Sequence, residues 1–563
     1  SKRQSEKAAM DILTIPTFQR FFSMDISQGR RPPGAGVGAS FSGQVARGHG
    51  VETSVESSEK GIQDSLAREL FFGRLGHNAN SNAPPLVRAL KLSCRRNEAS
   101  FHFPGHNRGR AAPSSLSELI GLAPFVYDFP ELDNDFSLNE PILEAQNLAA
   151  ELFGASKTWF LVGGTTCGIQ ASIMAACSPG NYIVLARNCH VSAISGMVLS
   201  GALPKYILPD YDSTWDFSGQ ISPIQVAKAI DELLEEGHKP AAVFVTSPTY
   251  HGICSNLSEI SSLCHSHGIP LIVDEAHGAH FGFDPQMPPS ALQQGADLVV
   301  QSTHKVLSSL TQSSMLHTSG DLIDIEKINR CLQILQTTSP STLLLASLDA
   351  ARDQIGQDPS NIFDHALELS LECKTLIRQI PGMDVFDSSS LPGCPPMDPL
   401  RLTVGCWRLG ISGFEADEAL DREYGVVTEL AGNRSVTFAI NLGTSREQTG
   451  RLVLGLEKLS LTSADVRVPE QKDDNYAPFP ATAMALSPRE AFFSKKRKVR
   501  LNESLGKVAG EMVCPYPPGI PVLIPGEIIT DRALGYLIDV LAKGVAVTGS
   551  SDRQPSSIVI CDV

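Results

Sequence analysis

Ser302-Thr303-His304-Lys305 directly follows an apolar run, residues 296–301, that predicts a buried strand. Asp274-Glu275-Ala276-His277 follows a similar run, residues 269–273. The two polar clusters are therefore expected at the carboxyl ends of neighbouring strands, the edge where open α/β sheets bind ligands. A lysine and an aspartate at this edge predict pyridoxal phosphate, because the amine can form a Schiff base and the carboxylate can keep the pyridine nitrogen protonated.

The composition predicts a large globular protein. A chain of 563 residues with 42% hydrophobic content can form about two to four domains of about 150 residues each. The net charge of -15 argues against a general nucleic-acid-binding protein, which is usually basic. No apolar run approaches the roughly 20 residues that span a bilayer. The 12 cysteines form no C-x-x-C pair and no zinc-type spacing, so we expect reduced thiols and no metal site.

The first residues differ in composition from the rest of the chain. The chain starts at Ser1 instead of Met, and residues 1–50 are rich in Ser and Gly and carry more Lys and Arg than Asp and Glu. This pattern predicts either the tail of an organelle transit peptide or an extension with no address, so the plastid and the cytoplasm are the expected locations. A basic stretch, residues 494–500, resembles a nuclear address, but a solvated basic face is favoured.

Strand-like and helix-like patterns alternate from residue 158 onward, which predicts βαβ units and a mostly parallel sheet. Strands are expected at 158–162, 182–185 and 241–245, and helices at 61–95, 167–177 and 224–236. A smaller α+β domain is expected next, with strands at 399–404 and 436–440 and helices from 362 and at 413–430. The last helix is expected at 531–543. The predicted divisions are a terminal extension, a helical segment with the large cofactor-binding domain, the small domain, a linker and a carboxyl-terminal region, at residues 1–60, 61–360, 361–467, 468–480 and 481–563.

Two further features of the predicted sheet edge suit a phosphorylated, ring-shaped cofactor. A glycine-rich turn, residues 163–168, opens a helix, and a helix amino end offers free N–H groups and a positive dipole to a phosphate. A plain tight turn is the alternative, and the Lys–Asp pair favours the phosphate site. His190 falls on the same edge, where an imidazole can stack on the pyridine ring and help move a proton. Considered alone, a core or surface histidine would be the better interpretation.

Asp274 and Lys305 also have simpler interpretations. An unpaired carboxylate at the end of an apolar strand is costly. A pyridinium partner would remove this cost at Asp274, and an ordinary helix cap is the alternative. A lysine at a strand end is usually solvated, but Lys305 follows Ser302 and His304, which can contact phosphate oxygens. Desolvation and nearby cations are expected to lower the pKa of Lys305 and make its amine nucleophilic.

Several motifs together resemble the Orn/Lys/Arg decarboxylases, fold type I pyridoxal-phosphate enzymes, in their compact arginine-decarboxylase-like branch. The resemblance covers residues 101–349 and 399–527. It is carried by the segments FHFPGH at 101–106, GGTTCG at 163–168, NCH at 188–190, SPTY at 247–250, VDEAHG at 273–278, STHK at 302–305 and PYPPGIP at 515–521. It implies a transferase-like α/β large domain with a mostly parallel sheet, followed by smaller α+β regions.

The resemblance also implies roles for individual residues. Lys305 carries the cofactor, Asp274 pairs with the pyridine nitrogen, and His190 stacks on the ring. His277 lies beside the cofactor, and the phosphate is held at the turn that contains Gly164 and by Thr165, Thr166, Ser302 and His304. Family members are dimers or larger with active sites between subunits, so we expect a homodimer or a higher homo-oligomer. Thr338 and Ser339 are expected to reach the neighbouring subunit's phosphate.

The predicted function is decarboxylation of a basic amino acid, with arginine favoured and lysine or ornithine as other substrates, feeding polyamine synthesis. Recognition of the substrate's distal cation needs carboxylates, and the candidates are Asp133, Asp135, Glu511 and Glu527. The acidic loop at 128–136 is a few residues shorter than the family leads one to expect, and Asn107 stands where a lysine is common. The alternatives are an aminotransferase or aldolase of the same fold, and a weakly active member with a regulatory or binding role.

Overall fold

The computed structural model describes residues 83–94, 99, 101, 103–128, 139–391, 393, 395–463, 483–515, 520–542, 545–550 and 556–563. All of these residues belong to one compact unit, Phe72–Val563. The terminal extension predicted at 1–60 and the linker predicted at 468–480 lie outside the described residues, as does most of the acidic loop at 128–136.

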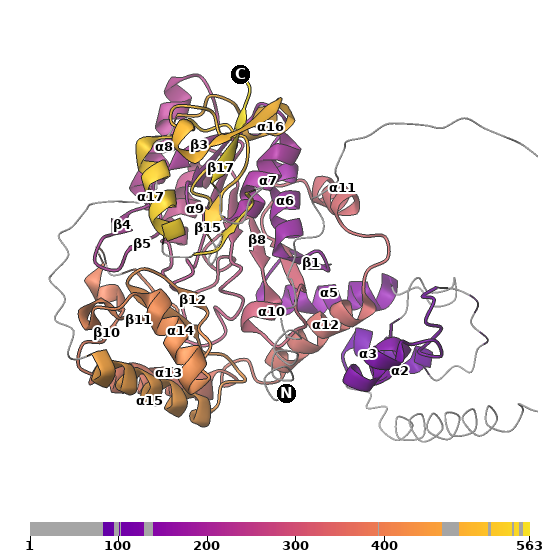
Figure 1. The fold of residues 1–563 in the computed structure, drawn as a ribbon. Helices are drawn as coiled ribbons and strands as arrows, with labels where there is room; N and C mark the ends of the chain where they lie inside the picture. Colours follow the sequence, from indigo (N-terminus) through magenta and orange to yellow (C-terminus); the bar gives the residue numbers. More distant parts are fainter. Residues whose placement is uncertain are drawn as a thin grey trace, which may run out of the picture. The chain divides into compact units, whose positions relative to one another are not determined.

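A seven-stranded sheet forms the centre of the large domain (Figure 1). Its strands are β1 Lys157–Leu161, β2 Tyr182–Ala186, β3 Leu203–Ile207, β6 Ala242–Thr246, β7 Leu271–Asp274, β8 Leu298–Gln301 and β9 Ser314–Thr318. They lie in the order β1-β9-β8-β7-β6-β2-β3. Neighbours from β8 to β3 are parallel, whereas β9 is antiparallel to both β8 and β1. The mostly parallel sheet predicted from the sequence is confirmed.

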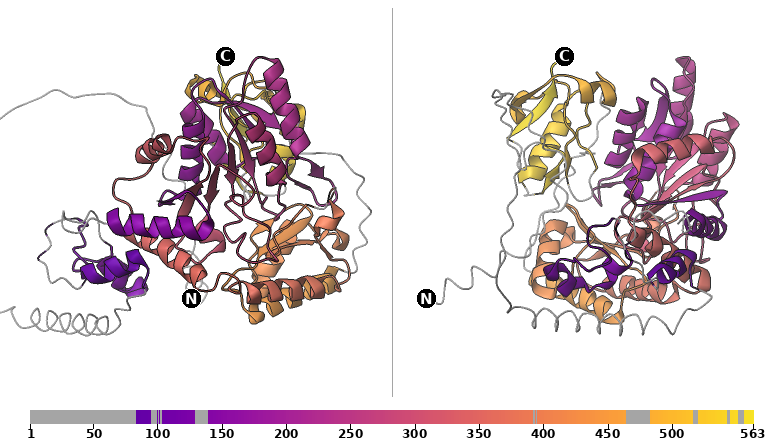
Figure 2. Two further views of the ribbon diagram at one scale, coloured as in Figure 1. Left: turned by 180° about the vertical axis from the view of Figure 1, so that it is seen from behind. Right: turned by 90° about the vertical axis from the view of Figure 1, so that its right-hand side faces the viewer.

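Helices lie on both sides of this sheet (Figure 2). The helices of the large domain from residue 139 onward are α5 Asn139–Phe153, α6 Gly164–Ala176, α7 Val191–Ser200, α8 Pro223–Glu235, α9 Leu257–Ser266, α10 Thr303–Val306, α11 Ile325–Leu335 and α12 Thr342–Gln357. Three others precede them, α2 Pro85–Cys94, α3 Ser114–Ile120 and α4 Ala123–Val126. No helix in the described parts of the chain is long and apolar enough to cross a membrane.

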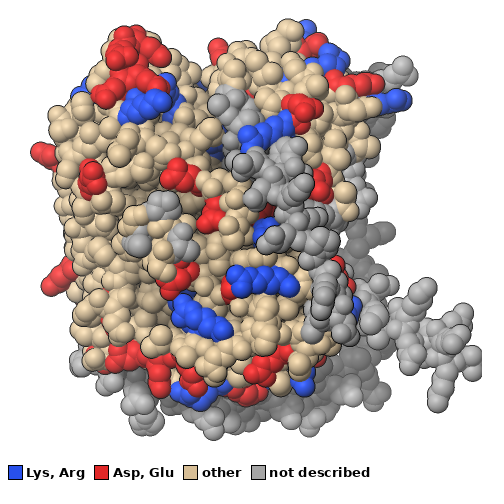
Figure 3. Space-filling model, turned by 90° about the vertical axis from the view of Figure 1, so that its left-hand side faces the viewer, with Lys and Arg blue, Asp and Glu red and all other residues tan. Residues whose placement is uncertain are grey.

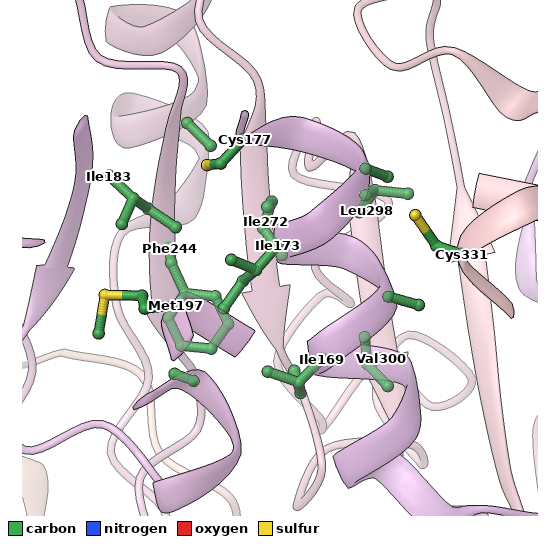
Figure 4. Packing of buried hydrophobic residues seen from close by; sticks show 14 of the residues in the cluster. Ile169, Ile173, Cys177, Ile183, Met197, Phe244, Ile272, Leu298, Val300 and Cys331 are labelled. Carbon is green, nitrogen blue, oxygen red and sulfur yellow. The ribbon is translucent and has the colours of Figure 1, made fainter. Parts of the chain in front are cut away.

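Helix α6 packs closely on the sheet and so fixes the position of its own amino end. Its Ile169 and Ile173 are fully buried and lie near Phe244 of β6 and Ile272 of β7 (Figure 4), and burying such a side chain contributes about 1.5–3 kcal/mol. A Cβ on Gly168 would lie 2.5 Å from a methyl carbon of Val300 in β8. Glycine at this position therefore lets the helix approach the strand.

The small domain is a four-stranded antiparallel sheet with three helices. Its strands are β10 Asp384–Val385, β11 Arg401–Gly405, β12 Leu430–Ala431 and β13 Ser435–Ala439, in the order β10-β11-β13-β12, and its helices are α13 Asp364–Ile377, α14 Gly413–Tyr424 and α15 Arg446–Ser463. The helix predicted at 413–430 was drawn too long. Gly425 ends α14 in the left-handed conformation with φ 60°, and a strand begins at Leu430.

The carboxyl-terminal region, coloured yellow in Figure 2, forms small sheets and two helices. Its elements are α16 Pro488–Phe493, β14 Lys496–Arg500, β15 Cys514–Pro515, α17 Asp531–Ala542, β16 Val547–Thr548 and β17 Ser557–Cys561. The basic stretch at 494–500 mostly forms β14, which pairs with β17. Its strand exposes four basic side chains and buries Val499, as expected for a solvated basic face. Basic and acidic side chains are interspersed on the face shown in Figure 3.

Candidate active site

The two polar clusters meet at the carboxyl ends of β7 and β8, as predicted. Asp274 is the last residue of β7 and pairs with Val300 of β8. The Ser302 residue that follows β8 lies at the amino end of the short helix α10. The backbone N–H of Lys305 donates to the carbonyl oxygen of Ser302 at 3.1 Å. One turn therefore presents the Lys305 side chain beside the end of β7.

Lys305 lies against His277, although a substantial part of the lysine is exposed. Its Nζ is 3.0 Å from Nε2 of His277. Burial lowers the pKa of Lys305, while Asp274 and Glu429 oppose this shift. Burial, followed by the charges of Lys305 and Arg401, holds the pKa of His277 well below its usual range. The His277 imidazole is therefore neutral and can accept a hydrogen bond from the Lys305 amine. The lowered pKa of Lys305 also means that its amine binds a proton less tightly than a free lysine does.

Asp274 is a buried carboxyl group, with 4% of the residue exposed. Burial raises its pKa to about 6, although the charge of Lys305 and the N–H of Ala276 act in the opposite direction. The Ala276 N–H donates to Oδ1 at 3.1 Å. The helix-cap alternative is wrong, because turns follow β7 where that cap would need a helix. The carboxylate charge of Asp274 is therefore poorly compensated by the described residues, and a cation beside it would lower its free energy.

Hydroxyl groups gather at the amino end of α6. Thr165 Oγ1 lies 2.5 Å from Ser302 Oγ and 2.8 Å from Ser314 Oγ. Gly164 has a φ of 73°, and no side chain caps the helix at Gly163. Free N–H groups and a helix dipole therefore adjoin three hydroxyl groups, which together suit a phosphate. Sequence reasoning missed Ser314, whose strand runs antiparallel to the others and starts at this edge.

Two other residues predicted to bind the phosphate, Thr166 and His304, are not part of the hydroxyl cluster around Thr165. Thr166 is exposed in the first turn of α6. His304 uses Nδ1 to contact the carbonyl oxygen of Ser313 at 2.7 Å, so only Nε2 is left to meet a ligand. Thr338 and Ser339 are exposed in the segment between α11 and α12, and their contact with another subunit's phosphate stays a prediction.

His190 caps α7 at the end of β2. Its Nδ1 accepts a hydrogen bond from the N–H of Ser192 at 3.2 Å. Burial and the charge of Lys305 lower the pKa of His190 to about 4. The ring is therefore neutral and its orientation is fixed by the cap.

A buried ion pair holds the loop that carries His190. Arg187 Nε and Nη2 each donate to a carboxylate oxygen of Glu527 at 2.6 Å, and both side chains are at most 3% exposed. Arg187 also donates to the carbonyl oxygens of Pro521 and Val522 at 2.8 and 3.2 Å. The carboxyl-terminal region is thus attached three residues before His190.

The acidic residues predicted to recognise a distal cation are not gathered at this edge. Glu527 is occupied by Arg187, and Glu511 accepts a hydrogen bond from the N–H of Val559 at 2.8 Å. Asp133 and Asp135 lie outside the described residues. The prediction for Glu527 is therefore wrong in this respect, because a more distant part of the chain supplies its cationic partner.

Comparisons with known proteins identify the family. The family model described as "Orn/Lys/Arg decarboxylase, major domain" matches residues 84–409, and the model of the family's C-terminal domain matches residues 470–544. The chain belongs to the Orn/Lys/Arg decarboxylase family. It is 34% identical over 474 residues to "Arginine decarboxylase" of Bacillus subtilis, covering 83% of this chain and 96% of that protein. It is 22% identical to the constitutive lysine decarboxylase of Escherichia coli, over 82% of this chain and 78% of that protein.

Solved structures of lysine decarboxylases share the fold of this decarboxylase. The Francisella novicida enzyme LdcF has a TM-score of 0.72 at 22% identity, over 91% of this chain and 84% of that chain. The constitutive Escherichia coli enzyme has a TM-score of 0.73 at 20% identity, over 91% and 85%. The predicted fold type I class and the predicted pyridoxal-phosphate-dependent decarboxylase activity are confirmed by these comparisons.

The residues of this decarboxylase fit pyridoxal phosphate. Lys305 provides an amine with a lowered pKa, and Asp274 provides a buried carboxylate whose charge lacks full compensation. The hydroxyl groups around Thr165 and the amino end of α6 provide donors for a phosphate. The amine, the carboxylate and the phosphate donors of this chain are therefore the groups that pyridoxal phosphate requires.

Sequence reasoning missed two charged residues that the small domain of the decarboxylase contributes. Arg401 of β11 is buried, and its charge lowers the pKa values of Lys305 and His277. Glu429, just before β12, is exposed and raises the pKa of Lys305. The strand containing Arg401 was predicted, but a strand pattern does not show that its domain packs against the end of β7.

Proposed function

We propose that this decarboxylase acts on arginine, with lysine and ornithine as poorer substrates. The observation that carries the choice of a basic substrate is Glu429, a carboxylate close enough to Lys305 to raise its pKa. No hydrogen bond or ion pair of the Glu429 side chain occurs among the residues that the structure describes. It is thus available to a guanidinium or ammonium group at the far end of a substrate. The names of the more similar relatives favour arginine.

When bound, pyridoxal phosphate supplies an aldehyde that joins to an amine and a pyridinium ring that accepts the electron pair left by the departing carboxylate. The residues of the chain orient the reacting groups and transfer protons to and from the substrate. Lys305 Nζ accepts a proton from the substrate ammonium group and returns a proton to Cα, and His277 Nε2 at 3.0 Å orients that amine. Asp274 keeps a proton on the ring nitrogen, and the Thr165 cluster binds the phosphate.

Product analysis tests this proposal. The purified protein, incubated with pyridoxal phosphate, should release carbon dioxide from arginine with a kcat/KM at least about tenfold above those for lysine and ornithine, a difference of about 1.4 kcal/mol. Formation of a keto acid or an aldehyde in place of carbon dioxide would indicate an aminotransferase or aldolase. Release of carbon dioxide mainly from lysine or ornithine would refute the choice of arginine.

We also propose that the enzyme is a homodimer or a higher homo-oligomer whose product amine enters polyamine synthesis. Phe101, Phe103 and Leu119 are 98%, 82% and 80% exposed, and such apolar side chains favour burial against another surface. Sedimentation of the cofactor-loaded enzyme should give a dimer or larger. A fully active monomer at assay concentration would contradict this proposal.

A further inference from the structure

A cavity lies beside the candidate active site, and none of the predicted site residues lines it. It has a volume of about 150 Å³, and a cavity of about this size holds a benzene-sized molecule in another protein. Its walls come from the ends of β2 and β6, the segment 216–221, the small domain around residues 430–435, and α17 of the carboxyl-terminal region.

The cavity wall includes three side chains, Asp216, Gln220 and Thr246, whose oxygen atoms can accept hydrogen bonds. Asp216 receives hydrogen bonds from the Tyr211 hydroxyl and from Nδ2 of Asn433, the second at 2.6 Å. Gln220 Oε1 and Thr246 Oγ1 are buried and have no hydrogen-bond partner in the described structure. Leaving such oxygen atoms without partners costs about 1–3 kcal/mol each. A ligand with several N–H donors would satisfy them.

The charge in the cavity wall also selects a cation. Asp216 is the one carboxylate among the described lining residues, and no Lys or Arg is among them. Burial lowers the pKa of the lining residue His251 to about 3, so this ring carries no positive charge. The aromatic residues Phe217, Phe414 and Tyr536 also line the cavity. One face of Phe217 is stacked on His251, with ring centroids 4.0 Å apart, and uncovered ring faces attract organic cations.

We propose that this cavity binds a primary alkylammonium ion of the class that decarboxylation of a basic amino acid produces. An ammonium group has three N–H donors, and Asp216, Gln220 and Thr246 provide acceptors. An amino acid fits worse, because its carboxylate would be buried without a basic partner in the described wall and beside a like charge. The site thus distinguishes the amine product from the substrate.

A ligand in the cavity should affect catalysis through two lining residues that lie close to active-site side chains. Asn188 lines the cavity two residues before His190. Tyr250 also lines it, and the centre of its ring lies 4.8 Å from that of His277, which contacts Lys305. A ligand at this position therefore touches the elements that hold the active-site rings, so we expect it to lower kcat at saturating substrate.

Calorimetric titration with putrescine and agmatine tests binding without turnover, so its outcome is independent of the proposed arginine activity. The wild-type protein should bind these amines at a site that Asp216→Asn weakens at least tenfold. Thr246→Val should weaken the same site several-fold; it removes no hydrogen bond present in the structure and should fold normally. Asp231→Asn, an equal charge change on the exposed side of α8, is the control and should bind like wild type.

Kinetics distinguish this site from product binding at the active site. Putrescine should lower kcat of the wild type and of Asp231→Asn at saturating substrate, and this effect should be lost in Asp216→Asn. A purely competitive effect, equal binding to the wild type and to both cavity variants, or no binding to the wild type would overturn the proposal. Tight binding of arginine to the same site would overturn the selection of product over substrate.

Discussion

The buried pair of Arg187 and Glu527 allows a quantitative test of how the carboxyl-terminal region supports the active site. Glu527→Gln keeps the size of the side chain and removes its charge. Arg187 would then remain buried, still donating to two backbone carbonyl oxygens but lacking a counter-ion. The variant therefore isolates the charge at one contact between the two regions.

The expected loss of stability follows from burial and geometry. Arg187 and Glu527 are 3% and 1% exposed and form two hydrogen bonds of 2.6 Å, and removing one partner of such a pair typically costs about 3–5 kcal/mol. Arg497 and Asp562 form a pair in the same region that is 52% and 56% exposed. An exposed pair contributes about 0–1 kcal/mol, so Asp562→Asn is the matched control.

Hydrogen exchange measures the local consequence. In Glu527→Gln, the amides of residues 187–193 and 521–529 should exchange at least about a hundredfold faster, since about 2.7 kcal/mol corresponds to that factor. Asp562→Asn should leave these amides unchanged. If Glu527→Gln exchanges like the wild type, or if both variants change equally, the pair does not hold the His190 loop and the reasoning is refuted.

Other predictions concern the active site. Asp274→Asn should lower carbon dioxide release about a hundred- to several-thousand-fold, a loss of about 3–5 kcal/mol in transition-state stabilisation; near-normal turnover would exclude its role at the ring nitrogen. Burial raises the pKa of Asp274 to about 6 from 3.8, so the folded state holds the proton more tightly. In thermal unfolding of the cofactor-free protein, stability should therefore fall as the pH rises from 3.8 to about 6. Asp274→Asn should lack this pH-dependent part of the stability. Glu429→Gln should raise KM for arginine about tenfold with little change in kcat, and an unchanged KM would exclude Glu429. Thr165→Val should weaken cofactor binding about tenfold in an absorbance titration, and unchanged binding would remove Thr165 from the phosphate site.

The sequence was sufficient to predict that Asp274 and Lys305 lie at one edge of the sheet. Asp274 and Lys305 each follow an apolar strand, and adjacent parallel strands place their carboxyl ends at one edge. The phosphate site near Thr165 follows from the same rule, because a glycine-rich turn joins β1 to α6. These inferences need only local patterns and the pairing of strands within one sheet.

The partners that come from other regions could not be predicted in this way. Glu527 was expected to meet a substrate, yet it binds Arg187, 340 positions away in the sequence. Glu429 and Arg401 reach Lys305 because the small domain packs against the sheet edge. No periodicity or motif reports such packing, which depends on the shape and charge of complete surfaces.

The contacts of Arg187, which directly follows β2, explain how the carboxyl-terminal region supports the candidate active site. The N–H of Arg187 donates to the carbonyl oxygen of Ile207 at 2.8 Å, which ties its backbone to the end of β3. Its side chain is held by Glu527 and two carbonyl oxygens, and His190 is held by its cap on α7. The predicted stacking of His190 on a cofactor requires a fixed ring orientation, since small displacements of a catalytic group are costly. The carboxyl-terminal region thus supports His190 by fixing the chain on which it stands, and Glu527, which was predicted to contact the substrate, is used for this purpose instead.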